Sequence, residues 1–133
     1  MSQQERTYID PDVNMENQAY WEAAKENRLV LKRCTSCGKT HFYPRSICPH
    51  CWSTETEWYE ASGKGTIYTY SVMRRAEVPY VIAYVTLEEG ITMMTNLVDC
   101  DFDALRVGEP VEVQFRQTEG GWALPVFRPV AAA

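Results

Sequence analysis

The chain has 133 residues, a formal net charge of −5 and 45% hydrophobic residues. This length and hydrophobic content predict one compact domain with a small appendage and a sizeable core. No apolar run approaches the roughly 20 residues of a membrane-spanning helix. The first twelve residues are polar and lack the apolar region of a signal peptide. We therefore expect a cytoplasmic protein that does not enter a membrane.

The first predicted element is a helix over residues 14–28, within an N-terminal segment that we bound at residues 1–28. Asn14 suits the N-cap, and acidic residues lie early and basic residues late, as the helix dipole favours. Tyr20 lies on the apolar face, with Trp21 beside it. These aromatics either pack against the rest of the chain or dock another protein, and they are the candidate partner-docking residues.

Two Cys-x-x-Cys pairs follow with ten residues between them, and their members are Cys34, Cys37, Cys48 and Cys51. Four thiolates on two short turns suit one tetrahedral Zn²⁺ ion, or iron in the same geometry. Because four sulfur ligands leave no position for substrate, the predicted zinc is structural. A reducing compartment disfavours disulfides, and two independent redox dithiols are not expected at this spacing.

The remaining cysteine and the two histidines are interpreted more simply. His41 and His50 lie close to the cysteine pairs and could each replace a ligand, but we expect both to be loop residues beside the metal. Cys100 lies far along the chain, and a small buried hydrophobe is favoured over a reactive thiol.

Residues 29–60 are predicted to form a zinc ribbon, with short strands at 29–31, 40–43 and 57–60. Between residues 28 and 54 there is no acid, and the cations are Arg28, Lys32, Arg33, Lys39 and Arg45. Such cations offset the negative charge of zinc bound by four thiolates. They could equally meet an anionic ligand, and the sequence leaves both interpretations open.

Residues 61–133 are predicted to form a five-stranded barrel. A tight turn at 88–90 and a short helical turn at 101–107 separate β-rich runs, which lie at 66–73, 80–87, 91–98, 111–115 and 122–127. Three meandering strands, a helical connection and a closing hairpin indicate an OB-fold. An SH3-like barrel is the main alternative, and the helical connection favours the OB-fold. The predicted fold is therefore mainly β: a helix, a rubredoxin-like zinc ribbon and an OB-fold.

Nucleic-acid binding and independent catalysis are both disfavoured. The second and third barrel strands, at 80–87 and 91–98, contain neither Lys nor Arg, whereas affinity for nucleic acid comes largely from neutralising phosphates. Common catalytic motifs, such as Gly-x-Ser-x-Gly, His-Glu-x-x-His and a phosphate loop with lysine, do not occur. We assign no catalytic residue.

The order of the motifs resembles a known family. The matching segments are Tyr20-Trp21, Leu31-x-Arg33-Cys34-x-x-Cys37-Gly38, Pro44-Arg45-x-x-Cys48-Pro49-x-Cys51, Ser62-Gly63-Lys64-Gly65, Pro79-Tyr80-Val81-Ile82-Ala83, Asn96-Leu97-Val98, Gly108-x-Pro110-Val111-x-Val113 and Pro125-Val126-Phe127. These segments are similar to the acyl-CoA-associated zinc-ribbon/OB-fold proteins, catalogued as domain-of-unknown-function family thirty-five. The resemblance covers nearly the whole chain.

The resemblance implies a non-catalytic scaffold that works beside a thiolase-like enzyme of the acetyltransferase, hydroxymethylglutaryl-CoA synthase or aldolase type, or beside a MaoC-like hydratase. It implies acyl-CoA as a ligand shared with that partner. A stand-alone acyl-CoA-binding module is the first alternative, and a single-strand nucleic-acid-binding OB protein is the second.

Coenzyme A carries phosphates that need Arg or Lys donors. The candidates are Lys39, Arg45, Arg74 and Arg75. They are either solvated surface charges, or some of them face a shared coenzyme A path between ribbon, barrel and partner. The sequence departs from the family pattern at two places. The connection at 73–79 is shorter than expected, and Trp52 follows the last cysteine where glycine is common.

Overall fold

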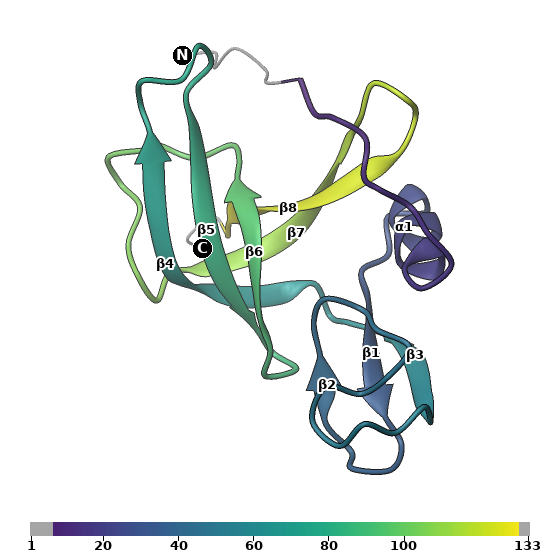
Figure 1. Cartoon of the computed structure of the whole chain (residues 1–133). Coiled ribbons are helices and arrows are strands. Elements are labelled where there is room, and N and C mark those ends of the chain that lie inside the picture. The colour runs from purple at the N-terminus through teal and green to yellow at the C-terminus, as the bar shows by residue number, and fades with distance from the viewer. Residues whose placement is uncertain (1–6, 131–133) are drawn as a thin grey trace.

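The computed structural model describes residues 7–130. One helix is followed by a small three-stranded sheet and a closed five-stranded barrel (Figure 1). The elements are α1 (Gln18–Lys25), β1 (Val30–Cys34), β2 (Thr40–His41), β3 (Thr56–Glu60), β4 (Lys64–Met73), β5 (Tyr80–Leu87), β6 (Thr92–Leu97), β7 (Pro110–Gln117) and β8 (Ala123–Pro129). The predicted division at residues 28 and 60 is compatible with this order and stays a prediction.

Helix α1 begins one turn later than the sequence predicts. The Asn14 side chain does act as a cap, but on the preceding turn, where its Oδ1 accepts the N–H groups of Glu16 at 2.9 Å and Asn17 at 3.0 Å. Asn17 therefore occupies the N-cap position, without a side-chain cap bond of its own. The helix buries one face, formed by Tyr20, Trp21, Ala23 and Ala24.

The ribbon sheet has the order β2-β1-β3, and both pairings are antiparallel. Strand β1 pairs with β2 through Lys32 opposite His41, and with β3 from Val30 opposite Glu60 to Cys34 opposite Thr56. This small sheet has few buried residues of its own beyond β1, so it depends on its loops and on α1 for a stable arrangement.

The barrel closes in the order β4-β5-β6-β8-β7, with β7 pairing back to β4. Alternation along the strands directs large apolar side chains inward, and Ile67, Val81, Val85, Val111 and Phe127 are all nearly fully buried. The predicted mainly β architecture and OB-fold are confirmed. At 101–107, where a short helical turn was expected, the connection contains turns and no helix, and one turn is closed by the Ala104 N–H donating to the Asp101 carbonyl at 3.0 Å.

The segment before α1 joins the barrel to the ribbon. At the barrel, the Asp10 carboxylate accepts hydrogen bonds from the Thr118 hydroxyl and, at 2.9 Å, from the Gly120 N–H. At the ribbon, Glu16 Oε2 accepts the Ser46 N–H at 2.7 Å. Helix α1 itself contacts both β8 and β1 and lies between the two sheets (Figure 1).

Among residues 7–130, no helix is both long enough and apolar enough to cross a membrane.

Candidate metal centre

Two similar turns present the four predicted metal ligands. In the first turn the Gly38 N–H donates to the Cys34 carbonyl at 2.8 Å, and in the second the Trp52 N–H donates to the Cys48 carbonyl at 2.9 Å. The closing residue has a positive φ in both, 76° at Gly38 and 68° at Trp52. The departure from glycine therefore leaves the turn intact and places a bulky side chain in a left-handed conformation.

The four Sγ atoms lie in one cluster, all within 4.8 Å of one another. The Cys34–Cys51 pair is 3.5 Å apart and the Cys37–Cys48 pair is 3.7 Å apart. A tetrahedral Zn²⁺ with bonds of about 2.3 Å needs sulfurs about 3.8 Å apart, so the cluster has the right size. The N–H groups of Cys37 and His50 point at the sulfurs of Cys34 and Cys48, each at 3.4 Å.

The electrostatics of the cluster also fit a cation. The Cys37 N–H, together with neighbouring donors, lowers the pKa of the Cys34 thiol to about 6. The Ser53 N–H lowers the pKa of Cys51, but the Cys34 sulfur and burial outweigh it and raise that pKa to about 12. Four thiolates cannot share this space without a compensating charge, which a divalent ion supplies. The residues fit zinc in a closed, structural site.

Neither histidine belongs to the sulfur cluster. His41 is buried, and its Nε2 accepts the Arg45 N–H at 3.2 Å, while burial lowers its pKa. His50 is exposed on the second turn. Cys100 is buried in the barrel core, and burial raises the pKa of its thiol to about 11, which disfavours the reactive thiolate.

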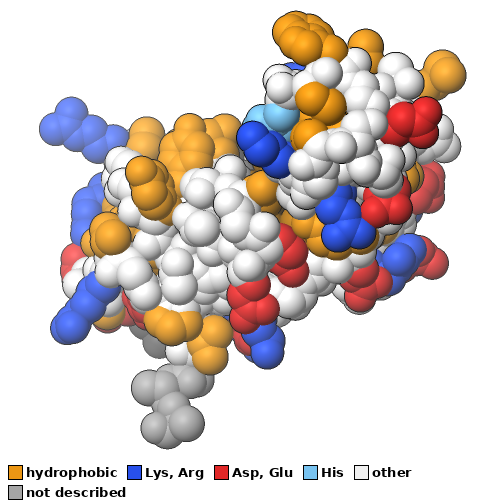
Figure 2. All heavy atoms as spheres, turned by 90° about the horizontal axis from the view of Figure 1, so that it is seen from below, with side chains coloured by type: hydrophobic (Ala, Val, Ile, Leu, Met, Phe, Trp, Pro, Cys, Tyr) orange, Lys and Arg blue, Asp and Glu red, His pale blue; other side chains and the backbone are white. Residues whose placement is uncertain are grey.

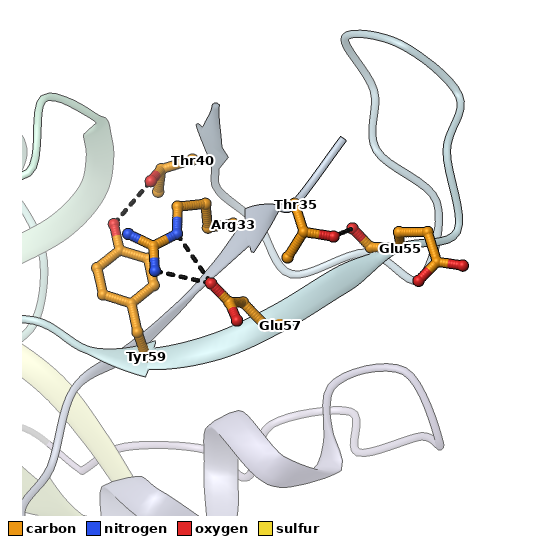
Figure 3. Close-up of polar contacts among 6 residues, drawn as sticks. All are labelled: Arg33, Thr35, Thr40, Glu55, Glu57 and Tyr59. Atoms are coloured by element: carbon orange, nitrogen blue, oxygen red, sulfur yellow. Dashed lines mark hydrogen bonds and ion pairs between the residues drawn. The ribbon is translucent and has the colours of Figure 1, made fainter. Parts of the chain in front are cut away.

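Two of the five cations at residues 28–54, Arg28 and Arg33, form ion pairs with nearby acids. Arg33 lies opposite Glu57, and its Nε and Nη2 donate to the same carboxylate oxygen at 3.1 and 2.7 Å (Figure 3). The Arg33 guanidinium also stacks on Tyr59, whose hydroxyl bonds with Thr40 at 2.7 Å. Arg28 similarly reaches Glu26 and Glu60. The pairs with Glu57 and Glu60 form only when β3 folds back along β1.

The four candidate coenzyme A residues do not come together. Lys39 and Arg45 are exposed on the ribbon. Arg74 and Arg75 lie in the connection from β4 to β5, at the end of the barrel away from the ribbon (Figure 1). Arg74 also pairs with Asp103 at 2.7 Å. The structure therefore does not bring all four residues together on one path.

The two candidate docking aromatics are buried within the chain. Tyr20 is 2% exposed and packs against Phe42 and Tyr43 of the ribbon, and Trp21 is 9% exposed and packs against Tyr43. The Tyr43 hydroxyl accepts hydrogen bonds from Trp21 Nε1 at 2.8 Å and Asn17 Nδ2 at 3.0 Å. The structure thus gives these aromatics a role in fixing helix and ribbon together. A direct partner contact through them stays a prediction.

Two exposed apolar residues at the ribbon tip were not singled out as docking residues from the sequence. Trp52 is 80% exposed and Ile47 is 49% exposed, on the second cysteine turn and just before it. The signal that could have found Trp52 was its position after the last cysteine, where a positive φ favours glycine.

A four-cysteine zinc ribbon followed by an OB barrel defines the class of this protein. Family models match both parts: a ChsH2 rubredoxin-like zinc ribbon domain over residues 21–57 and a ChsH2 C-terminal OB-fold domain over residues 58–116. A DUF35 domain-containing scaffold protein of Methanocaldococcus jannaschii is 42% identical over 73% of this chain and 74% of its own length. The chain belongs to this DUF35 scaffold family.

Other relatives carry enzyme-subunit names. A probable enoyl-CoA hydratase alpha subunit of Thermomonospora curvata is 40% identical over 90% of this chain, but the match spans only 39% of that longer relative. The benzoylsuccinyl-CoA thiolase subunit BbsA of Geobacter metallireducens is 32% identical over 78% of this chain and 75% of its own length. A solved structure, the Ltp2-ChsH2(DUF35) aldolase, matches with a TM-score of 0.82 and 38% identity over 92% of this chain and 100% of the matched chain.

Proposed function

We propose that this chain is a non-catalytic accessory subunit that supports acyl-CoA chemistry on a thiolase-like partner. The closed metal centre is the observation that carries the proposal. All four ligands are cysteines, so the metal has no position for water or substrate, and its contribution is to hold the ribbon in one shape. The family assignment and the subunit names of the relatives, a thiolase subunit and an aldolase component among them, support a partner of this kind.

The partner's reaction is an acetyl transfer, a hydroxymethylglutaryl-CoA synthase condensation or an aldol cleavage, and the hydratase names among the relatives support a MaoC-like enzyme as a second associate. We place the complex in the cytoplasm. The division into a helical segment at 1–28, a ribbon at 29–60 and a barrel at 61–133 belongs to the same proposal.

Co-purification tests the function directly. The tagged chain, expressed in its native cells with zinc, should retain a protein that mass spectrometry identifies as thiolase-like, in a fixed ratio by native mass spectrometry. The partner's turnover of a CoA thioester should fall when this chain is withdrawn. Turnover of CoA thioesters by this chain alone would contradict the proposal.

Lys39 and Arg45 are the candidates that we retain for the coenzyme A phosphates, because they share the ribbon. Arg75 supplies a matched control, since it is exposed at the other end of the barrel. We expect Arg45→Ala to weaken binding of coenzyme A to the complex in calorimetric titrations, and Arg75→Ala to leave it unchanged. Equal affinities for the wild type, Arg45→Ala and Arg75→Ala would remove Arg45 from the coenzyme A site.

A further inference from the structure

Beyond the exposed Lys64 at the start of β4, the outward side of β4, β5 and β6 carries no charged side chain. Cross-strand pairing aligns its side chains in three rows, which are Ser71, Ile82 and Asn96; Thr69, Tyr84 and Met94; and Thr66, Thr86 and Thr92. These nine residues, together with Tyr68 at the bulge between Ile67 and Thr69, are called the sheet face below. Every one is exposed or half-buried, while their neighbours along β5 point into the core.

The opposite side of the same barrel is charged, as a solvated surface normally is. On β7 and β8, Glu112 pairs with Arg128 at 2.9 Å, and Arg116 pairs with Asp99 at 2.8 Å. The chain as a whole has 23% charged residues. The uncharged sheet face is therefore a local property of three adjacent strands and does not follow from the composition of the chain.

The exposed side chains of the sheet face are those that favour protein contacts. Tyr68 is 65% exposed, Tyr84 is 44% exposed and Met94 is 61% exposed. Aromatic residues and Met are enriched at the centres of interfaces, where charged residues are depleted. Covering this face removes apolar surface from water without stripping water from any charge, so the desolvation cost is low.

The sheet face is too small to hold a partner alone. Strands about 4.8 Å apart, rising about 3.3 Å per residue, give three strands of six residues a projected area of roughly 300 Å². A stable interface buries about 800 Å² on each partner. Pairing of two copies through this face alone falls short of that area, so a stable partner must also cover a further part of the chain.

A second exposed apolar part is the ribbon tip, formed by Ile47 and Trp52. Figure 2 looks at the molecule from below and shows hydrophobic side chains gathered on the barrel beside the ribbon and again at the outer edge of the ribbon. Trp52 has a positive φ at the position that Gly38 occupies in the first cysteine turn. A bulky residue kept in this strained conformation with its side chain in water indicates a function for the indole.

We propose that the sheet face and the ribbon tip form one docking surface for the thiolase-like partner. The proposal rests on the proposed function and names the part of the chain that carries it. The chemistry of the partner's surface follows from this one. The partner presents an uncharged, apolar patch to Tyr84 and Met94 and a pocket that receives the indole of Trp52. Trp is among the residues that most often dominate binding energy at such contacts.

The test compares three variants in titrations against the co-purified thiolase-like protein. Met94→Lys places a charge at the centre of the sheet face, and Trp52→Gly removes the indole. Gln117→Lys is the matched control, because it adds the same charge at an exposed position of β7. We expect the first two to raise the dissociation constant at least about tenfold and the control to change it less than about twofold. Trp52→Gly should also keep or raise the melting temperature, because glycine relieves the positive φ.

The outcomes separate the two proposals. Suppose that the wild-type chain forms a complex with a thiolase-like protein. If that protein binds Met94→Lys and Trp52→Gly as tightly as it binds the wild type, the docking surface is overturned and the proposed function stands. Absence of any such complex with the wild-type chain overturns both. A wild-type dimer in solution that Met94→Lys dissociates, seen by light scattering, overturns the proposal by assigning the sheet face to a second copy.

Discussion

The Tyr43 hydroxyl is a single atom that joins helix α1 to the ribbon, and its removal gives a sharp prediction. It accepts two hydrogen bonds, from the indole of Trp21 and the amide of Asn17, and both donor residues are buried. Tyr43→Phe preserves the ring but leaves both donors without this acceptor. An unsatisfied buried donor costs about 1–3 kcal/mol. Because Tyr43 is only half-buried and water can reach it, we expect the lower end for each donor, about 2 kcal/mol in total.

For a chain of this length, about 2 kcal/mol corresponds to a fall of roughly 6–10 °C in melting temperature. Thermal unfolding of the zinc-loaded protein, followed by near-ultraviolet circular dichroism, measures it. Tyr59→Phe is the matched control, because it removes a half-buried hydroxyl whose hydrogen bond is with the exchangeable hydroxyl of Thr40, at 2.7 Å. That variant should lose about 0.5–1 kcal/mol. Equal losses in the two variants would refute the reasoning that two buried donors depend on Tyr43.

Three further predictions concern the metal, pH and the start of the barrel. Cys48→Ser should abolish stoichiometric zinc by elemental analysis and unfold the ribbon, since structural zinc contributes roughly 10–16 kcal/mol in small zinc peptides. The unfolding free energy should fall as pH drops below about 6.5, because burial lowers the pKa of His41 and the unfolded chain takes up the proton first. In denaturant titrations repeated at several pH values, the unfolding free energy of His41→Gln should depend less on pH than that of the wild type. Gly63→Ala should cost about 2–4 kcal/mol, because its Cβ would lie 2.5 Å from Val113 at a positive φ, whereas Gly90→Ala, with a positive φ in open space, should cost about 1 kcal/mol.

The sequence predicted those parts of the fold that depend on local pattern. Alternation of apolar residues placed all five barrel strands within a few residues of their observed ends, and cysteine spacing predicted the metal centre. The start of α1 was wrong because Asn14 and Asn17 both suit an N-cap, and the sequence does not say which turn begins the helix. The connection at 101–107 was expected to hold a short helical turn, and Asp101 closes a turn there that does not continue as a helix.

The sequence could not predict contacts between residues far apart along the chain. For the basic run at 28–54 the sequence left open an offset to the zinc thiolates or an anionic ligand, and it did not show that pairing of β1 with β3 brings Glu57 to Arg33. For Tyr20 and Trp21 the sequence offered either packing within the chain or docking of a partner, and it could not name Phe42 and Tyr43, about twenty residues later, as the rings they pack against. Such outcomes depend on tertiary packing, which local periodicity does not contain.

The attachment of Asp10 to the turn between β7 and β8 bears on how the protein can be shortened. The family-model matches, at 21–57 and 58–116, include neither Asp10 nor β8. A fragment cut at those limits would lack β8, the strand that hydrogen-bonds to both β6 and β7. The backbone edges of β6 and β7 would then be unpaired and could bind a strand of another molecule. The smallest autonomous unit therefore begins before residue 10 and reaches residue 129.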